Sequence, residues 1–266
     1  MDFINYSKNE VKLKVKEVDG FGAYFILENF IQDFYFDRLV KDFQKIKKDW
    51  KKHCNLISDS NIGGGNDRVI GGDGAGIDKF SGIMNQSNYW KMFIKTMYSK
   101  EFKRYVFDIW EDTKYYEEIC DKYNIKTMGC KISMQTRGYG WPIHQDGNRK
   151  VISFLLYLGK MGWTEDSKGG TDFYRVSETK VDWDKSEKSM DYQMRRGQFS
   201  HKKASLNKKH VDYLEKFESV EFKPNRLVGF IKTNTSYHSI TKRELPKGIT
   251  RDCFQINVWN LKTKRG

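Results

Sequence analysis

The stretch WPIHQDGNRKVISFLLYLG, residues 141 to 159, places a histidine and an aspartate one residue apart, directly before one of the most apolar runs of the chain. In an extended strand, residues i and i+2 point to the same side, so His144 and Asp146 share one face. That face of a strand usually turns toward the core. Both the fold and the function must therefore account for a polar pair at the start of an apolar strand.

The second half of the chain is rich in short runs of β-forming residues separated by Gly, Pro, Asn and charged turns. These runs are IKTMGCKISMQTRGYG, KVISFLLYLG, GGTDFYRV, SVEFKPNRLVGFIKT and DCFQINVWNL. Such a pattern is typical of antiparallel sheets. We predict a β sandwich or barrel over residues 125–262, with the charged segment at about 176–218 projecting from the sheet as an insertion.

The first half, residues 1–124, is predicted to support this sheet mainly with helices. Residues 25–53 indicate a short strand, a turn and an amphipathic helix, and residues 88–112 indicate a second helical apolar face. The apolar positions at helical spacing are Phe34, Phe36, Leu39, Val40 and Phe43 in the first segment, and Trp90, Phe93, Ile94, Met97, Phe102, Tyr105, Val106 and Ile109 in the second. We interpret both faces as packing surfaces.

A glycine-rich stretch, NIGGGNDRVIGGDGAG, lies at residues 61–76. It lacks the Lys-Ser/Thr pair of a phosphate-binding loop, and neither a preceding buried strand nor a following helix is evident. We predict a mobile surface loop here, lying over a site.

Length and composition favour one soluble α+β domain. The chain has 266 residues, of which 15% are aromatic and only 3 are proline, so it can bury a sizeable core. The net charge of +13 is spread along the chain; it would attract nucleic acid, acidic glycans or anionic metabolites, and we interpret it mainly as solvated surface lysine. The 4 cysteines form no CxxC, and no run is long and apolar enough to span a membrane, so a reduced, cytoplasmic setting is expected.

His144 and Asp146 supply two of the three ligands of a facial triad, in which two histidines and one carboxylate hold ferrous iron. The third ligand must be a distant histidine. His53, His201 and His210 lie in lysine-rich or charged segments and are expected at the surface. His238 differs, because it follows the apolar run RLVGFIKTNTSYH and would lie at a strand end opposite His144.

A lone HxD motif is weak, but its order with other features is specific. HxD at 144–146 is followed by an apolar YL strand, GG at 169–170, PNRLVGF at 224–230, His238 and then Arg251. Over roughly residues 125–262 the chain resembles the iron(II) and 2-oxoglutarate-dependent oxygenases, in the branch similar to prolyl 4-hydroxylases. The resemblance implies a double-stranded β-helix (jelly-roll) core with flanking N-terminal helices.

The resemblance also implies roles for particular residues. His144, Asp146 and His238 would be the catalytic metal ligands, and Arg251 would grip the distal carboxylate of 2-oxoglutarate with a bidentate guanidinium. Arg243 is the rival for this role, although its setting in SITKRELPKG favours a surface position. The family often places a serine two residues after the arginine, where this chain has Cys253, so a second hydrogen bond to the cosubstrate is in question.

Two further positions match the family's cosubstrate site less firmly. Tyr157 lies at the place of a tyrosine that hydrogen-bonds 2-oxoglutarate, and an ordinary core aromatic explains it equally well. Arg137, which shares strand parity with Gln135, lies where related enzymes often have a tyrosine near the cosubstrate. Asn257 would also face inward, and Tyr139 and Trp141 would form the rim where substrate enters.

The reaction implied is hydroxylation of an unactivated C–H bond by O2, with decarboxylation of 2-oxoglutarate to succinate and with ascorbate as a helpful reductant. Asp146 is retained, whereas halogenating relatives have lost this carboxylate, so hydroxylation is favoured over halogenation; desaturation and demethylation stay open. The substrate would be an amino acid, a peptide or another polar molecule, including prolyl residues of a protein. The ending RDCFQINVW lacks the pattern of nucleic-acid demethylases, which disfavours nucleic acid. The alternative of another class is a non-catalytic binding module with the same β-helix.

Overall fold

The computed structural model describes residues 3–48, 56–62, 65–71, 76–121, 126–147, 150–159, 169–176, 214–240 and 249–260. The helical elements are α1 (Lys8–Lys12), α2 (Asp33–Lys48), a 3-10 turn (Ile77–Phe80), α4 (Ser81–Gln86), α5 (Asn88–Met97), α6 (Lys100–Asp108) and α7 (Tyr116–Asp121). The strands are β1 (Lys16–Val18), β2 (Gly22–Leu27), β3 (Leu56–Ile62), β4 (Gly65–Gly71), β5 (Lys126–Gln135), β6 (Trp141–His144), β7 (Lys150–Tyr157), β8 (Thr171–Val176), β9 (Leu214–Val220), β10 (Leu227–Ile231), β11 (Tyr237–Ile240) and β12 (Arg251–Asn260).

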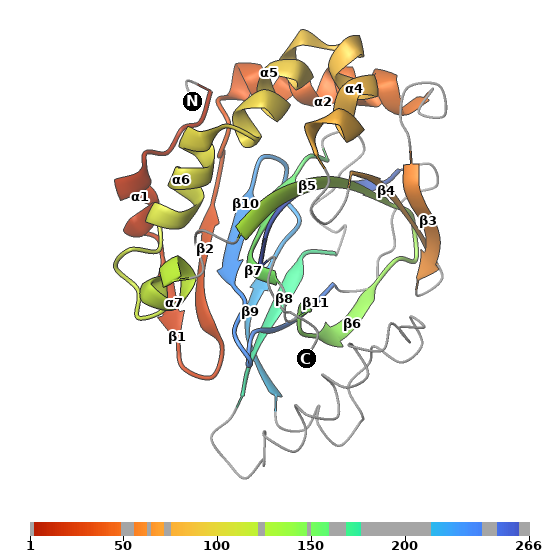
Figure 1. Ribbon diagram of the computed structural model, residues 1–266. Coiled ribbons are helices and arrows are strands. Elements are labelled where there is room, and N and C mark those ends of the chain that lie inside the picture. Colours follow the sequence, from red (N-terminus) through yellow and green to blue (C-terminus); the bar gives the residue numbers. More distant parts are fainter. Residues whose placement is uncertain are drawn as a thin grey trace, which may run out of the picture.

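The strands form two antiparallel sheets (Figure 1). The larger sheet has the order β1-β2-β10-β7-β12-β5-β4-β3, and the smaller has the order β6-β11-β8-β9. The apolar run of the opening stretch is β7, which lies between β10 and β12 near the middle of the larger sheet. The antiparallel sheets predicted from about residue 125 onward are therefore confirmed, in an α+β architecture.

Strand β12 shows how one strand serves two environments. Phe254, Ile256 and Val258 belong to the large apolar core that includes the helices, whereas Cys253 belongs to a second cluster with residues of the smaller sheet. Alternate side chains of a strand point to opposite faces, so the polar residues Arg251 and Asn257 share the face of Cys253. The side of the sheet away from the main helices thus receives the polar residues.

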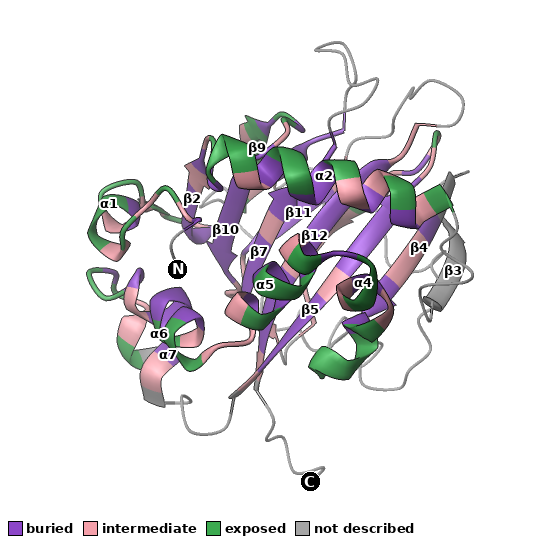
Figure 2. Ribbon diagram, turned by 90° about the horizontal axis from the view of Figure 1, so that it is seen from above, coloured by how far each residue is buried: buried purple, intermediate pink, exposed green. Residues whose placement is uncertain are grey.

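The helices cover the opposite face of the larger sheet. Figure 2 shows α2, α4 and α5 lying across it, and buried residues of these helices, such as Leu39, Ile83 and Phe93, belong to the large apolar core. All the apolar positions predicted to pack in residues 88–112 are buried, but they lie on two helices, since Ser99 caps a new helix by accepting a hydrogen bond from the Phe102 amide. In α2, Phe34 is 58% exposed and is not part of the core. It occupies the first turn, next to Tyr35 and under Arg38, beyond the stripe that faces the sheet.

The prediction of a mobile loop at residues 61–76 is wrong for the part that the structure describes. Strands β3 and β4 form an antiparallel hairpin there, and β4 pairs with β5 to extend the larger sheet. Gly71 has a positive φ of 82°, and a Cβ at this position would lie 2.5 Å from the Cys130 carbonyl oxygen. Gly71 thus permits a close approach of β4 to β5, and the residues NDRVI that precede it supply the strand.

The double glycine at 169–170 has a packing role at the start of β8. A Cβ on Gly170 would lie 1.5 Å from the carbonyl oxygen of Val220, so only glycine lets β8 meet the end of β9 at this distance. Strand β9 begins at Leu214, inside the segment predicted as an insertion, so that segment ends earlier than expected. The remainder of the insertion, residues 177–213, lies outside the described residues, as do His53, His201, His210 and Arg243.

No helix among the described segments is both long and apolar enough to cross a membrane.

Candidate metal and cosubstrate site

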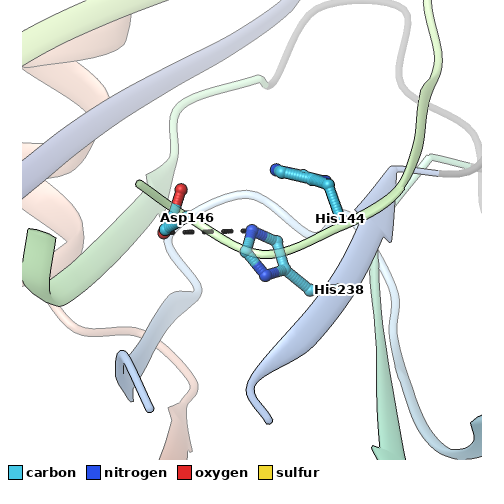
Figure 3. A group of neighbouring side chains, drawn as sticks. All are labelled: His144, Asp146 and His238. Atoms are coloured by element: carbon cyan, nitrogen blue, oxygen red, sulfur yellow. Dashed lines mark ion pairs between the residues drawn. The ribbon is translucent and has the colours of Figure 1, made fainter. Parts of the chain in front are cut away.

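Three side chains that can bind a metal converge where β6 meets β11. The sheet register makes His144 and His238 direct partners across these two strands, and Asp146 follows β6 by two residues. The imidazole centroids are 4.3 Å apart, and the ligand atoms of all three residues lie within 4.8 Å of one another. Figure 3 shows the three side chains turned toward a common point. The sequence-based choice of His238 as the partner of His144 agrees with this geometry.

Backbone contacts fix the orientation of both imidazoles. Nδ1 of His144 lies 2.9 Å from the carbonyl oxygen of Pro142, and Nδ1 of His238 lies 3.2 Å from that of Ser236. Because a carbonyl oxygen only accepts, each Nδ1 donates its proton, and Nε2 keeps a lone pair. A metal-binding histidine is commonly held through its other ring nitrogen in this manner.

The Asp146 carboxylate is held by two residues of β7. Lys150 donates to Oδ1 at 2.8 Å and Ser153 donates to Oδ2 at 2.9 Å. Lys150 is nearly buried, and its ammonium lies 5.3 Å from the Trp259 ring centroid. Neither Ser153 nor Lys150 was predicted to serve the site, although the spacing of four residues between Lys150 and Asp146 is visible in the sequence.

Electrostatics favour the protonation states that a divalent cation needs. Burial, together with the neighbouring His238, lowers the pKa of His144 to about 3, and burial lowers the pKa of His238 as well. Burial opposes ionisation of Asp146, but the nearby ammonium of Lys150, with further contributions from His238 and His144, outweighs it and holds the pKa of this carboxyl below its usual range. Neutral imidazoles and an ionised carboxylate are the forms that bind metal.

Arg251 lies at the other end of the polar face, at the first position of β12. Its side chain is fully buried, and its guanidinium carbon lies 5.0 Å from the ring centroids of both Tyr157 and Phe222. Nη1 donates to the Gln135 side-chain oxygen at 2.7 Å. Nε and Nη2 have no hydrogen-bond partner among the described residues. A buried charged group with two unused donors requires a compensating anion.

The two unused donors are well suited to a carboxylate. Nε–H and one Nη2–H point in the same direction along one edge of the guanidinium and can bind both oxygens of a carboxylate. The same edge of Arg175 does so in this protein, where Nε and Nη2 each contact one oxygen of Glu215 at 2.9 Å. Arg251 therefore has the donor arrangement needed for a free carboxylate.

The remaining predicted cosubstrate residues differ in where they lie. Tyr157 is buried beneath Arg251 and shares a hydrogen bond of 2.8 Å with the Thr171 hydroxyl, so it lies at this end of the site with its hydroxyl engaged. The prediction that Arg137 shares the face of Gln135 is wrong, because β5 ends at Gln135 and Arg137 is exposed in the following turn. Cys253 is buried beside Tyr157 in the sheet register.

Of the residues predicted to face inward or to form the rim, some lie where expected and one does not. Asn257 is 1% exposed, and its side-chain oxygen has no partner among the described residues. Trp141 is partly exposed and packs edge-on against the His144 ring at 5.6 Å, consistent with a rim position. Tyr139 is buried and does not form a rim. It hydrogen-bonds Asp67, a buried acid in β4 that was not among the predicted site residues.

The residues present fit ferrous iron and 2-oxoglutarate. Two Nε2 atoms and one carboxylate oxygen form a two-histidine, one-carboxylate set, and the unpaired edge of Arg251 fits the distal carboxylate of a dicarboxylic acid. Strand β7 links the two ends, because Ser153 holds Asp146 and Tyr157 lies beneath Arg251 on the same strand face. Four residues of strand correspond to roughly 13 Å.

Comparisons with known proteins show the fold. No protein-family model and no curated protein matches the sequence. A solved prolyl-4-hydroxylase from Pseudomonas putida is similar with a TM-score of 0.52 at 13% identity, covering 94% of this chain and 98% of that one.

Two non-haem α-ketoglutarate-dependent enzymes of nogalamycin biosynthesis also match. The epimerase SnoN and the carbocyclase SnoK both have TM-scores of 0.50 at 8% identity. The match with SnoN covers 95% of this chain and 82% of SnoN, and the match with SnoK covers 98% of this chain and 89% of SnoK. The double-stranded β-helix fold that these solved enzymes share is thereby confirmed for this chain.

Proposed function

We propose that this protein is an iron(II) and 2-oxoglutarate-dependent dioxygenase that hydroxylates an unactivated C–H bond. The observation that carries the proposal is the pairing of a His-Asp-His set with a buried arginine whose Nε and Nη2 lack partners among the described residues. A metal-ligand set alone would suit many reactions. The additional arginine edge favours a carboxylate-bearing cosubstrate.

Each residue of the site has a distinct task in this proposal. His144, Asp146 and His238 would hold the iron, leaving three coordination positions open. When bound, ferrous iron with 2-oxoglutarate would supply the oxidising chemistry, in which O2 converts the keto acid to succinate and CO2 and one oxygen atom enters the substrate C–H bond. Ser153 and Lys150 would keep the Asp146 carboxylate turned toward the metal.

The other end of the site would hold the cosubstrate in place. Arg251 would bind the distal carboxylate, with Tyr157 beneath its guanidinium. Arg251, Tyr157 and Phe222 form a buried wall that excludes water from the ion pair and so strengthens it. Because both ends are fixed on the β framework, the cosubstrate would have one orientation relative to the metal.

The substrate class is an amino acid, a peptide or another polar molecule. This assignment rests on the fold shared with a prolyl-4-hydroxylase and on the retained Asp146, which favours hydroxylation. Prolyl residues of a protein are the alternative substrate within the same reaction class.

The proposal is tested by adding ferrous iron and 2-oxoglutarate to the purified protein without O2. We expect a weak visible charge-transfer absorption that neither component gives alone, and succinate formation after O2 is admitted. A substrate screen scored by succinate release would then identify the molecule oxidised. Neither absorption nor succinate would favour the alternative, a β-helix that binds ligands without catalysis.

A further inference from the structure

The polar face of the larger sheet contains a buried carboxylate that the proposed reaction does not yet use. Asp67 in β4 is 9% exposed, and it faces Gln135 in β5, which in turn faces Arg251 in β12. Residues paired directly across antiparallel strands point to the same side of the sheet. Asp67, Gln135 and Arg251 therefore form one row across three adjacent strands.

Hydrogen bonds run along this row in one direction. Gln135 accepts from Nη1 of Arg251 through its side-chain oxygen, so its amide nitrogen is left to donate to Asp67, with which it shares a side-chain hydrogen bond. Without such a partner, the Gln135 amide could rotate by about 180° and present its nitrogen, instead of its oxygen, to Nη1 of Arg251. A carboxylate beside the amide nitrogen opposes this rotation, because it only accepts.

Asp67 is built into this position despite the cost of burial. Burial raises the pKa of Asp67, while the charges of Lys131 and Arg251 and hydrogen bonds from Gln135 and Tyr139 partly offset that effect. One oxygen, Oδ1, has no hydrogen-bond partner among the described residues. Asp67 thus hydrogen-bonds Gln135 and Tyr139, and its contact with Gln135 leads on to Arg251.

We propose that Asp67 is a positioning residue that acts through Gln135 to turn the Nε and Nη2 edge of Arg251 toward the distal carboxylate of the cosubstrate. This inference rests on the proposed function. With Nη1 held by Gln135, the guanidinium cannot rotate without breaking a buried hydrogen bond, so the free edge keeps one direction. Preorganised donors bind better because less conformational freedom is lost on binding.

If Asp67 acted only through its charge, its removal would change the affinity for 2-oxoglutarate in the opposite direction. As a negative charge near Arg251, Asp67 would weaken the binding of an anion, and its removal would strengthen it. As a positioning residue, its removal weakens binding of the distal carboxylate only. A keto acid without a distal carboxylate, such as pyruvate, uses the metal end alone and should not respond.

The test measures anaerobic binding of 2-oxoglutarate and of pyruvate to the iron-loaded full chain, through the visible charge-transfer absorption. We expect Asp67→Ala to weaken 2-oxoglutarate binding about 10-fold, as for other residues that orient a ligand-binding group, and to leave pyruvate binding within about 2-fold. Asp67→Asn keeps an oxygen acceptor for Gln135 and should recover most of the affinity. Asp112→Ala, at an exposed acid, is the matched control.

Gln135→Met carries the same test if Asp67→Ala does not fold, and it should show the same selective loss. When Asp67→Ala and Gln135→Met are combined, their losses of 2-oxoglutarate affinity should not add, because Asp67 acts on Arg251 through Gln135. Unchanged or tighter 2-oxoglutarate binding in Asp67→Ala would overturn the inference, and so would an equal loss for pyruvate. Absence of the absorption in the wild-type protein would instead overturn the proposed function, and the inference with it.

Discussion

The two ends of the candidate site solve the problem of burying polar groups in different ways. At the metal end, each residue already has a partner: the two imidazoles donate to the carbonyls of Pro142 and Ser236, and Asp146 is held by Lys150 and Ser153. At the carboxylate end, Arg251 is fully buried, and two of its nitrogens have no partner among the described residues.

The difference indicates which end is preformed and which is completed by a ligand. In the proposed function the metal end would gain a cation while its supporting hydrogen bonds stay in place. At the carboxylate end, two buried donors of Arg251 have no partner among the described residues, so anion binding there should also stabilise the fold. The two ends therefore respond to different perturbations.

Removal of a metal ligand should have the largest effect. We expect His144→Ala, Asp146→Ala or His238→Ala, or treatment of the wild-type protein with a chelator, to abolish both the anaerobic absorption and succinate formation, because two ligands do not hold iron in the required geometry. Restored activity after adding ferrous iron to the chelated wild type is the control. Full activity in any of the three variants would contradict the assignment of the metal end.

Replacement of Arg251 should affect the other end selectively. We expect Arg251→Lys to weaken 2-oxoglutarate binding about 100-fold, since a lysine cannot form the bidentate contact in a buried site. Pyruvate binding should change little. Titration of the anaerobic absorption measures both, and Arg243→Ala is the comparison variant. An unchanged requirement for 2-oxoglutarate in Arg251→Lys, with a raised one in Arg243→Ala, would move the role to Arg243.

The hydrogen bonds to Asp146 should have an intermediate effect. We expect Ser153→Ala to weaken ferrous iron binding about 10-fold, because outer partners of metal ligands commonly contribute this amount. Competition with a metal-binding dye measures the affinity directly. A loss of 2-oxoglutarate affinity at saturating iron, with iron binding unchanged, would show that Ser153 serves the carboxylate end instead.

Stabilisation by a dicarboxylate should be the smallest effect. Without metal, glutarate or succinate at about ten times its dissociation constant should raise the free energy of unfolding by about 1.4 kcal/mol, which corresponds to a few degrees in Tm. Thermal unfolding followed by circular dichroism measures this shift. Arg251→Met should lose it, and a monocarboxylate of similar size should give less. Equal shifts in wild type and Arg251→Met would contradict an anion site at this arginine.

Much of the fold and part of the site could be predicted from local sequence. The helical spacing in residues 88–112 and the β-rich runs after residue 125 are strong periodic signals, and the structure agrees with them. The glycine-rich stretch was misinterpreted because its hairpin depends on pairing between β4 and β5, which lie far apart in the chain. The prediction that Arg137 shares the face of Gln135 was wrong because β5 ends at Gln135, and the alternation of side chains ends with the strand.

The sequence by itself determined the donor types and their order: HxD, a later histidine at a strand end and an arginine at the head of the final strand. Only the tertiary structure decided that Asp67, Gln135 and Arg251 lie in one row and that His144 and His238 face each other across two strands. The physical reason is that residue type and spacing fix the chemistry and the facing of a side chain within its own strand. The register between distant strands, which decides which buried polar groups meet, is set by the packing of the whole sheet.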